Sequence, residues 1–203
     1  SHVDAPHPAI EISDPELCYG YFGRVITGIK VAKSPSALRY RLTACGIRPI
    51  SNVVDVTNYI LMECGQPLHS FDLARIRGGR VIVAPAKEGE HFTTLDGKER
   101  VLKADDLTIR DNDGVVALAG VMGGLDSEIT EASAGVFLES AVFRPATIRR
   151  TSRRLGLSSE ASFRFERGID QGRSRWSLDR ACAMIQQLAG GEVSDRLCEN
   201  EPR

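Results

Sequence analysis

The segment SNVVDVTNYILMECGQPLHSFD, from Ser51 to Asp72, sets six polar side chains among apolar residues. These are Asp55, Thr57, Asn58, Gln66, His69 and Asp72. A helix that only had to pack would not carry so many hydrogen-bonding groups close to its buried face, because a buried polar group needs a partner. A lone histidine is more often structural than catalytic, but its polar setting makes His69 a candidate for binding or catalysis.

Glu139 is a second candidate, because it is a lone carboxylate in the apolar segment FLESAVF (137–143). Successive side chains of a strand face opposite ways, so Glu139 would share a face with Phe137 and Ala141. A carboxylate buried there is costly unless it has a partner. That partner could be one of the chain's many arginines or the hydroxyl of a ligand, and the residues alone leave both open.

Gly123 and Gly124 are adjacent in ALAGVMGGLDSE (117–128), where a strand should be packing side chains. A structural interpretation of such a pair is a bulge or a tight turn. A functional interpretation is backbone held open to a ligand. The spacing favours neither.

Cys64, His69 and Asp72 have a spacing that a metal site could use, and Cys64 could act as a nucleophile. The sequence supplies no second Cys/His pair at the spacing of a zinc finger. We therefore predict no metal and interpret Cys64 as a core residue. Five cysteines without a CxxC pair predict free thiols in a reducing compartment, hence a cytoplasmic protein.

Arginines concentrate between Arg144 and Arg167, although the formal net charge of the chain is only −1. The candidates for RNA contact among them are Arg149, Arg150, Arg153 and Arg154. One interpretation is a solvated helix face with ion pairs. The other is a strip that contacts phosphates and positions an RNA end, since backbone contacts position without reading sequence. The small net charge argues against a protein whose whole surface grips nucleic acid.

The composition, 42% hydrophobic and 26% charged over 203 residues, is typical of a globular protein with a proper core. No apolar run approaches the roughly 18–20 residues that span a bilayer, so no membrane partner is expected. The N-terminus has neither the basic nor the apolar part of a signal peptide. The missing initiator Met and the start at Ser1-His2 indicate a piece of a longer chain.

Helices are expected towards both ends of the chain. Ser34-Pro35 opens a helix that Gly46 closes, and Asn52 caps a second one that ends at Cys64-Gly65. Pro67 stops this helix, so His69 should lie in a rigid connector just past its end. The remaining helices are predicted at FDLARI (71–76), at 144–156 and at about 172–189, the last burying Trp176, Ala181, Ile185 and Leu188.

The middle of the chain is predicted to be rich in strands. They are expected at YFGRVITGIKV, GRVIVAPA, EHFTTL, KERVL, LTIRD, VVALAGV and VFLESAVF. Asp96-Gly97 and Asn112-Asp113-Gly114 are hairpin turns, which implies antiparallel neighbours. The fold class is therefore α+β, with a largely antiparallel, barrel-like middle and flanking helices. We divide the chain into a tail or linker (1–17), one domain (18–193) and a polar, frayed tail (194–203).

Three segments together resemble the B3/B4 region of the bacterial phenylalanyl-tRNA synthetase β subunit. They are VVDVTNY…GQPLHSFD, the glycine turn with FLESAVF, and LGLSSEASFRFERG (155–168). The resemblance covers about residues 18 to 193 and implies an editing domain that hydrolyses mischarged Tyr-tRNA(Phe). It assigns Thr57, Asn58 and His69 to the editing pocket, Gly123-Gly124 to one wall, Glu139 to the para-hydroxyl of tyrosine, and Ser159, Glu160 and Ala161 to the side-chain pocket.

Within this resemblance, His69 and Asn58 are the catalytic candidates, which would orient the water and the ester. Ser159 departs from the family, where threonine is frequent, so a slightly looser pocket is expected. The implied partners are the tRNA(Phe) 3′ end and, through the full β subunit, the α subunit. No cofactor is expected for this domain, because the ATP and Mg of the parent enzyme belong to the α subunit.

Two other hypotheses stand beside editing. The chain could be a non-catalytic, RNA-binding or structural module of the synthetase, or a free-standing hydrolase of amino-acid esters that acts without the tRNA body. The polar pocket set favours editing, since a silent scaffold has no physical reason to keep those positions polar.

Overall fold

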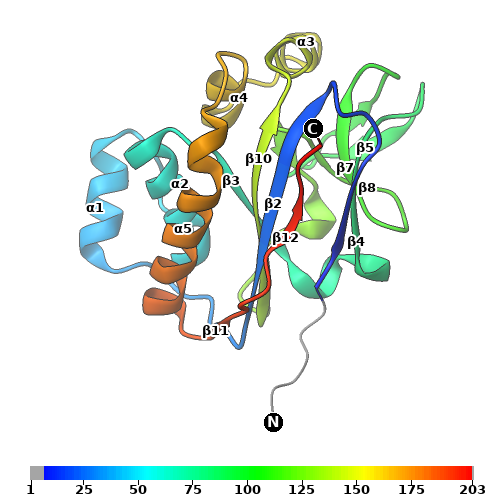
Figure 1. The fold of residues 1–203 in the computed structure, drawn as a ribbon. Coiled ribbons are helices and arrows are strands. Elements are labelled where there is room, and N and C mark those ends of the chain that lie inside the picture. The colour runs from blue at the N-terminus through cyan, green and yellow to red at the C-terminus, as the bar shows by residue number, and fades with distance from the viewer. Residues whose placement is uncertain (1–6, 203) are drawn as a thin grey trace.

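The computed structural model describes residues 7–202, which form two main β-sheets flanked by helices (Figure 1). The helices are α1 (Ser36–Ala44), α2 (Asn52–Cys64), α3 (Pro145–Leu155), α4 (Glu160–Phe165) and α5 (Ser174–Ala189). Within this described range, no helix combines the length and the apolar character that crossing a membrane requires.

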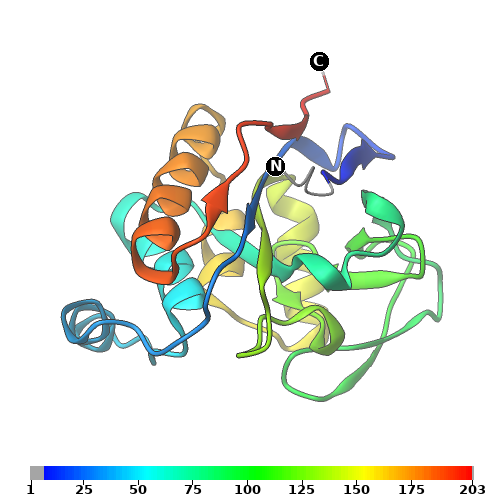
Figure 2. The same cartoon turned by 90° about the horizontal axis from the view of Figure 1, so that it is seen from below.

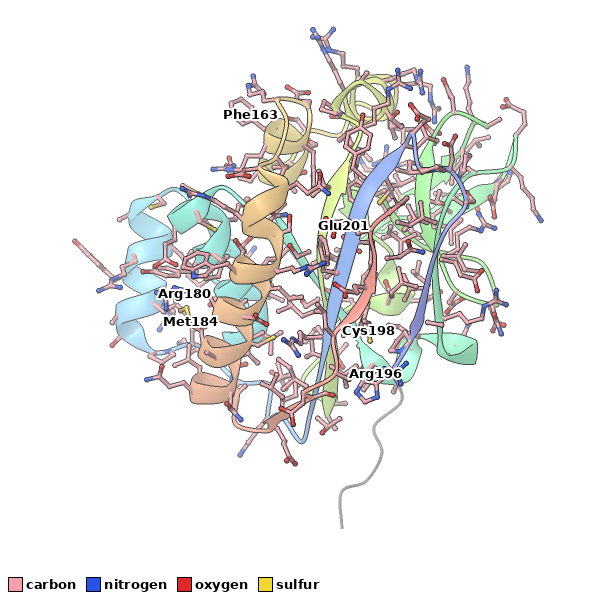
Figure 3. The ribbon with its side chains drawn as sticks, in the orientation of Figure 1. Phe163, Arg180, Met184, Arg196, Cys198 and Glu201 are labelled. Carbon is pink, nitrogen blue, oxygen red and sulfur yellow. The ribbon has the colours of Figure 1, made fainter. Side chains whose placement is uncertain are left out.

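The inner sheet is built on the long antiparallel pair of β2 (Cys18–Thr27) and β10 (Gly135–Phe143). Its other strands are β3 (Leu68–Asp72), which pairs with the free edge of β10, and β11 (Glu192–Val193) and β12 (Cys198–Asn200), which pair with β2. Cys198, which is labelled in Figure 3, lies on β12 and pairs with Gly23 of β2.

The outer sheet has the strand order β1-β4-β7-β8-β9. The strands are β1 (Ala9–Ile12), β4 (Arg80–Pro85), β7 (Leu107–Arg110), β8 (Val115–Leu118) and β9 (Met122–Gly123). Only the β1–β4 pair of the described strands is parallel. A separate hairpin of β5 (His91–Thr93) and β6 (Glu99–Val101) follows β4.

Strand β10 divides the apolar core into two parts. Val136 and Leu138 pack with side chains of α2 and α5 on one face of the inner sheet. Phe137 and Ala141 alternate with them and pack between the two sheets. The result is three layers, in which the helical layer and the outer sheet lie on opposite faces of the inner sheet (Figures 1 and 2).

The α+β class predicted from the sequence is confirmed, as are both hairpin turns and the face of β10 that carries Glu139. The barrel-like expectation is wrong, because neither sheet of the described residues closes on itself. The domain division stays a prediction. Residues 1–6 of the expected N-terminal tail lie outside the described range, and residues 9–12 of it form β1.

Three local expectations are corrected. Ser51, not Asn52, caps α2 by accepting a hydrogen bond from the Val54 amide. Ala181 and Ile185 of α5 are buried as predicted, but Trp176 is 53% exposed, and Leu178 is buried in its place. The C-terminal segment is not frayed throughout, because β12 pairs with β2 and buries Cys198.

Candidate functional site

His69 and Glu139 stand directly opposite each other in the β3–β10 ladder. The predicted connector is therefore wrong, because the chain enters strand β3 at Leu68, immediately after Pro67. Gln66 anchors this entry, since its buried amide donates to the carbonyls of Pro67 and Ala141. Opposite residues of an antiparallel pair present their side chains on the same face, so the imidazole and the carboxyl group share one side of the sheet.

Glu139 has one oxygen engaged and one free. The Tyr21 hydroxyl donates to Oε2 over 2.6 Å. Oε1 makes no hydrogen bond to another described residue. Among residues 7–202, every side-chain oxygen or nitrogen that is fully buried does have a hydrogen-bond partner. Oε1 therefore keeps accessible surface, and Glu139 lines a cavity. The partner left open by the sequence is thus a tyrosine and not an arginine.

Burial controls the protonation of this pair. It raises the pKa of Glu139 to about 7, although the hydrogen bond from Tyr21 acts in the opposite direction. Burial also raises the pKa of Tyr21 well above its usual value, and the negative charge of Glu139 adds to the effect. The phenol thus stays protonated and remains a donor to Glu139.

An inner pocket and an outer cleft meet at this place. The inner pocket is a cavity of about 60 Å³ whose lining is apolar apart from His69, Glu139 and backbone. The outer cleft measures about 290 Å³ and contains Thr57, Asn58 and Ser159. Seven residues line both spaces: Pro67, Leu68, His69, Val121, Met122, Gly123 and Ala161. The two spaces are therefore contiguous, with Glu139 on the inner side and the polar groups of α2 on the outer side.

His69 lies where the two spaces join. Its ring packs edge-on against Phe71, with 4.4 Å between the ring centroids. Burial lowers the pKa of the imidazole to about 4, so the ring is neutral near pH 7. Neither ring nitrogen hydrogen-bonds another residue in the range 7–202. A neutral imidazole with free nitrogens can accept from one molecule and donate to another.

Gly123 and Gly124 have different reasons to be glycine. A Cβ on Gly123 would lie 2.7 Å from Cε1 and 3.0 Å from Nε2 of His69. A Cβ on Gly124 would lie 2.6 Å from the Val116 carbonyl oxygen and 2.8 Å from the Phe92 ring. The first glycine therefore makes room for the imidazole, and the second allows the chain to approach both β8 and the β5–β6 hairpin. Close packing thus accounts for both glycines, and backbone held open to a ligand stays a prediction.

The remaining predicted pocket residues divide into free and engaged groups. The Asn58 amide makes no hydrogen bond to another described residue and borders the outer cleft. The Thr57 hydroxyl donates to the Val54 carbonyl over 2.7 Å. Ser159 caps α4 in a reciprocal capping box and donates to the Val121 carbonyl over 3.0 Å. Ala161, which follows this cap, borders both spaces.

The four arginines of α3 lie outside both spaces. Arg150 pairs with Asp105 and Arg154 pairs with the buried Asp106, so these two fasten α3 to the outer sheet's loops. Arg149 and Arg153 form no ion pair within residues 7–202. The interpretation as an ion-paired face thus holds for half of the strip, and RNA contact stays a prediction for the other half.

Cys64 and Asp72 do not join His69 in a cluster. The Cys64 thiol donates to the Ile60 carbonyl, and Asp72 accepts from the Ser133 hydroxyl and the Ala74 amide. No group of three or more His, Cys, Asp or Glu side chains within the described range is arranged to hold a metal ion.

Sequence reasoning missed Tyr21, the one side chain that holds Glu139. Its signal was present but weak. A tyrosine in an otherwise apolar strand buries a hydroxyl, and a buried tyrosine hydroxyl usually finds a partner. The identity of that partner depends on the pairing of β2 with β10, which places two residues 118 positions apart on neighbouring strands.

The chain matches a known family along most of its length. The family model described as the B3/4 domain matches residues 17–190. Phenylalanine–tRNA ligase β subunits of Nitratidesulfovibrio vulgaris and Oleidesulfovibrio alaskensis are 58% and 59% identical to it over 193 residues. These alignments cover 95% of this chain and 24% of each relative, so the chain spans about a quarter of their length. The β subunit of Porphyromonas gingivalis is 53% identical over 185 residues, which are 91% of this chain and 23% of the relative.

A solved structure shares the fold at low sequence identity. It is an N-terminal fragment of the phenylalanyl-tRNA synthetase β subunit from Pyrococcus horikoshii. The TM-score is 0.61 at 12% identity, over 95% of this chain and 54% of the fragment.

Alanine substitutions should separate the roles of the two glycines. Gly123→Ala should displace the His69 ring and change the local environment of the site, because the added methyl group meets a side chain. Gly124→Ala should lower the free energy of unfolding by more, about 1–3 kcal/mol, because the methyl group meets backbone and a packed ring. Chemical denaturation and the imidazole NMR signals measure the two effects. Equal destabilisation with an unmoved imidazole signal would contradict this assignment.

Glu139→Gln should change how stability depends on pH. With a pKa of about 7 in the folded chain and an ordinary pKa of 4.5 in the unfolded chain, wild-type Glu139 keeps a proton between these pH values that the unfolded chain has released. Its stabilising contribution is present below pH 4.5 and is lost as pH rises through 7. The variant should therefore gain stability relative to wild type, by about 3 kcal/mol between those limits.

Urea denaturation at several pH values measures this difference, and His69→Gln is the matched control. Burial lowers the pKa of His69 from 6.5 to about 4, so its contribution to stability is gained as pH rises through this window. That variant should lose stability relative to wild type over the same range. If the free energy of unfolding depends on pH in both variants as it does in wild type, neither Glu139 nor His69 is buried as described.

Proposed function

Because the chain belongs to the B3/4 domain family, we propose that it hydrolyses the ester of tyrosine wrongly attached to tRNA(Phe), as part of a phenylalanine–tRNA ligase β subunit. The observation that carries the proposal is the free Oε1 of Glu139 in an apolar pocket. The relatives named above supply the setting, a ligase for phenylalanine.

Glu139 supports a preference for tyrosine over phenylalanine. The two amino acids differ by one hydroxyl, and an apolar pocket rejects an added hydroxyl only by roughly a hundredfold. A pocket that hydrogen-bonds the hydroxyl instead favours the amino acid that has it and rejects the one that lacks it. Phenylalanine would leave Oε1 without a partner, and such a mismatch can discriminate by roughly 10⁴. The correct product is spared and the wrong one is admitted.

Tyr21 sharpens this preference. It occupies Oε2 through a bond of 2.6 Å, which leaves Oε1 as the acceptor that an incoming phenol meets. By favouring the ionised carboxyl group, the same bond keeps the pKa of Glu139 from rising further above about 7. An ionised Glu139 accepts hydrogen bonds only, as the recognition of a phenol donor requires.

The ester would lie at the junction of the two spaces. With the tyrosine side chain in the inner pocket, its carbonyl would reach the free groups of His69 and Asn58. Water attacks this carbonyl carbon, the bond to the terminal ribose oxygen breaks, and that oxygen leaves as a hydroxyl with a proton. In this arrangement neutral His69 orients the water, and Asn58 with nearby backbone amides stabilises the oxyanion.

The proposed partners follow from this reaction. They are the 3′ end of tRNA(Phe) and, through the rest of the β subunit, the α subunit that would hold ATP and Mg. Hydrolysis of an aminoacyl ester needs less assistance than cleavage of an amide, so the proposal routes no step through a metal or another cofactor.

Glu139→Ala should strongly reduce the preference for tyrosine. In single-turnover deacylation at high protein concentration, wild type should release tyrosine and spare phenylalanine on tRNA(Phe). The ratio of the two rate constants should fall by roughly two orders of magnitude in the variant. Ser140→Ala is the control, because its side chain lies on the opposite face of β10 and bonds the Ser174 carbonyl. Retained selectivity in Glu139→Ala would refute the role of Oε1. Wild type that deacylates neither substrate, even within the intact α/β enzyme, would favour a non-catalytic module.

His69→Ala should slow tyrosine release without changing the preference. Loss of one group that positions a water or an oxyanion typically lowers the rate constant by roughly 10²–10³. His69→Gln, which keeps donor and acceptor atoms but cannot act as a base near pH 7, should recover part of that loss. The same single-turnover assay with Tyr-tRNA(Phe) measures both, and a wild-type rate in His69→Ala would exclude a catalytic role.

A further inference from the structure

The segment from Leu17 to Val54 carries six Lys or Arg residues and no Asp or Glu, in a chain of net charge −1. Arg24 pairs with Asp179. The other five form no ion pair within residues 7–202: Lys30, Lys33, Arg39, Arg41 and Arg48. They lie on α1 and the chain at its two ends, at the outer side of the helical layer (Figure 1).

Exposed rings and apolar groups accompany these cations. Tyr40 on α1 is 77% exposed, and Ile50, just before α2, is 64% exposed. They are the two most exposed large hydrophobic side chains in the described range. Unpaired cations beside an exposed aromatic ring such as Tyr40 are typical of surfaces that bind single-stranded nucleic acid, where phosphates meet the cations and bases stack on the ring.

A groove joins this surface to the site. It has a volume of about 500 Å³ and is lined by Lys33 and Arg39 among others. Ile50 and Ile129 line both this groove and the outer cleft, so the two spaces meet there. The path from Ser51 to Asn58 follows seven residues of α2, or roughly 10 Å at 1.5 Å per residue. About three stacked nucleotides at 3.4 Å each cover that length.

We propose that the α1 groove, lined by Lys33 and Arg39, binds the single-stranded 3′ end of the RNA that carries the ester. This inference rests on the proposed function and adds the surface that presents the substrate. With the terminal ester at His69 and Asn58, the preceding nucleotides run along α2 towards α1. Their phosphates meet Lys33 and Arg39, and their bases meet Ile50 at the junction.

Of the two acidic groups that line the groove, only Glu131 is exposed, and Lys33 and Arg39 outnumber it. Asp55 is fully buried, and its oxygens accept hydrogen bonds from the Ser34 hydroxyl and the Ile50 amide. Glu131 is exposed, but it belongs to the segment after Ile129 and not to α1. The α3 strip offers only two unpaired arginines of four, and none of them lines the groove or the cleft.

Charge reversal of the groove tests the proposal with RNA that carries no amino acid. The probe is an RNA hairpin with a four-nucleotide single-stranded 3′ extension, compared with the same hairpin ending flush. Wild type should bind the extended hairpin more tightly. In Lys33→Glu/Arg39→Glu this preference should fall by about tenfold, and Lys33→Gln/Arg39→Gln should lie between. The slope of log K against log salt should decrease by about 1.4 in magnitude, for two phosphate contacts of a single strand at roughly 0.7 each.

Two further variants make the outcome specific. Lys98→Glu/Lys103→Glu changes the net charge by the same amount at the β5–β6 hairpin, on the opposite side of the molecule (Figure 1), and should bind as wild type. Arg149→Glu/Arg153→Glu tests the competing strip on α3. The proposal is wrong if Arg149→Glu/Arg153→Glu loses the preference for the extended hairpin while Lys33→Glu/Arg39→Glu keeps it. It is also wrong if both variants keep the wild-type preference.

The assay separates this inference from the proposed function, because binding of uncharged RNA requires no hydrolysis. Hydrolysis of tyrosyl-adenosine, which is too short to reach the groove, should be equal in wild type and Lys33→Glu/Arg39→Glu. The groove variant could lose its preference for the extended hairpin while neither protein hydrolyses tyrosyl-adenosine. That result would support the RNA-binding groove and count against the proposed hydrolysis. If wild type and Lys33→Glu/Arg39→Glu bind RNA equally and both hydrolyse tyrosyl-adenosine, the proposed hydrolysis stands and the proposed RNA-binding role of the groove is wrong.

Discussion

The carboxyl group of Glu139, buried between two β-sheets, is the constraint on which the site depends. A carboxylate in that position is costly unless it has partners. The chain supplies one partner, the Tyr21 hydroxyl, and leaves the other oxygen facing a cavity. A fully satisfied Glu139 would be a structural residue, and an unsupported one would be protonated over a wider range of pH. One engaged and one free oxygen create a defined acceptor in an apolar pocket.

The surrounding elements place this acceptor next to groups that can act on an ester. The β3–β10 register sets His69 opposite Glu139, and Gly123 leaves room for the imidazole against the outer sheet. Capping of α4 by Ser159 brings Ala161 to the border of both spaces, while α2 provides Asn58 on the outer side. Under the proposed function, recognition and hydrolysis would use these adjoining spaces. The same burial keeps His69 neutral and raises the pKa of Glu139.

Local patterns predicted parts of the fold, whereas the set of pocket residues came from the resemblance to a family. Alternation along FLESAVF correctly placed Glu139 with Phe137 and Ala141, and the turn signals correctly predicted two hairpins. Contacts between distant segments were beyond such patterns. The Tyr21–Glu139 bond depends on strand pairing, as does the place of His69 in a strand after Pro67. Helical periodicity correctly predicted the burial of Ala181 and Ile185 in α5 but not the exposure of Trp176, because the packing of α5 buries Leu178 instead.

A crystal structure of the chain with tyrosyl-adenosine, joined by an amide in place of the ester, would show directly what the phenol contacts. The phenolic oxygen should lie about 2.7 Å from Oε1 of Glu139, with Tyr21 still donating to Oε2. The carbonyl should lie beside His69 and Asn58. A tyrosyl ring bound in the outer cleft, or a phenolic oxygen that does not contact Glu139, would contradict the central claim.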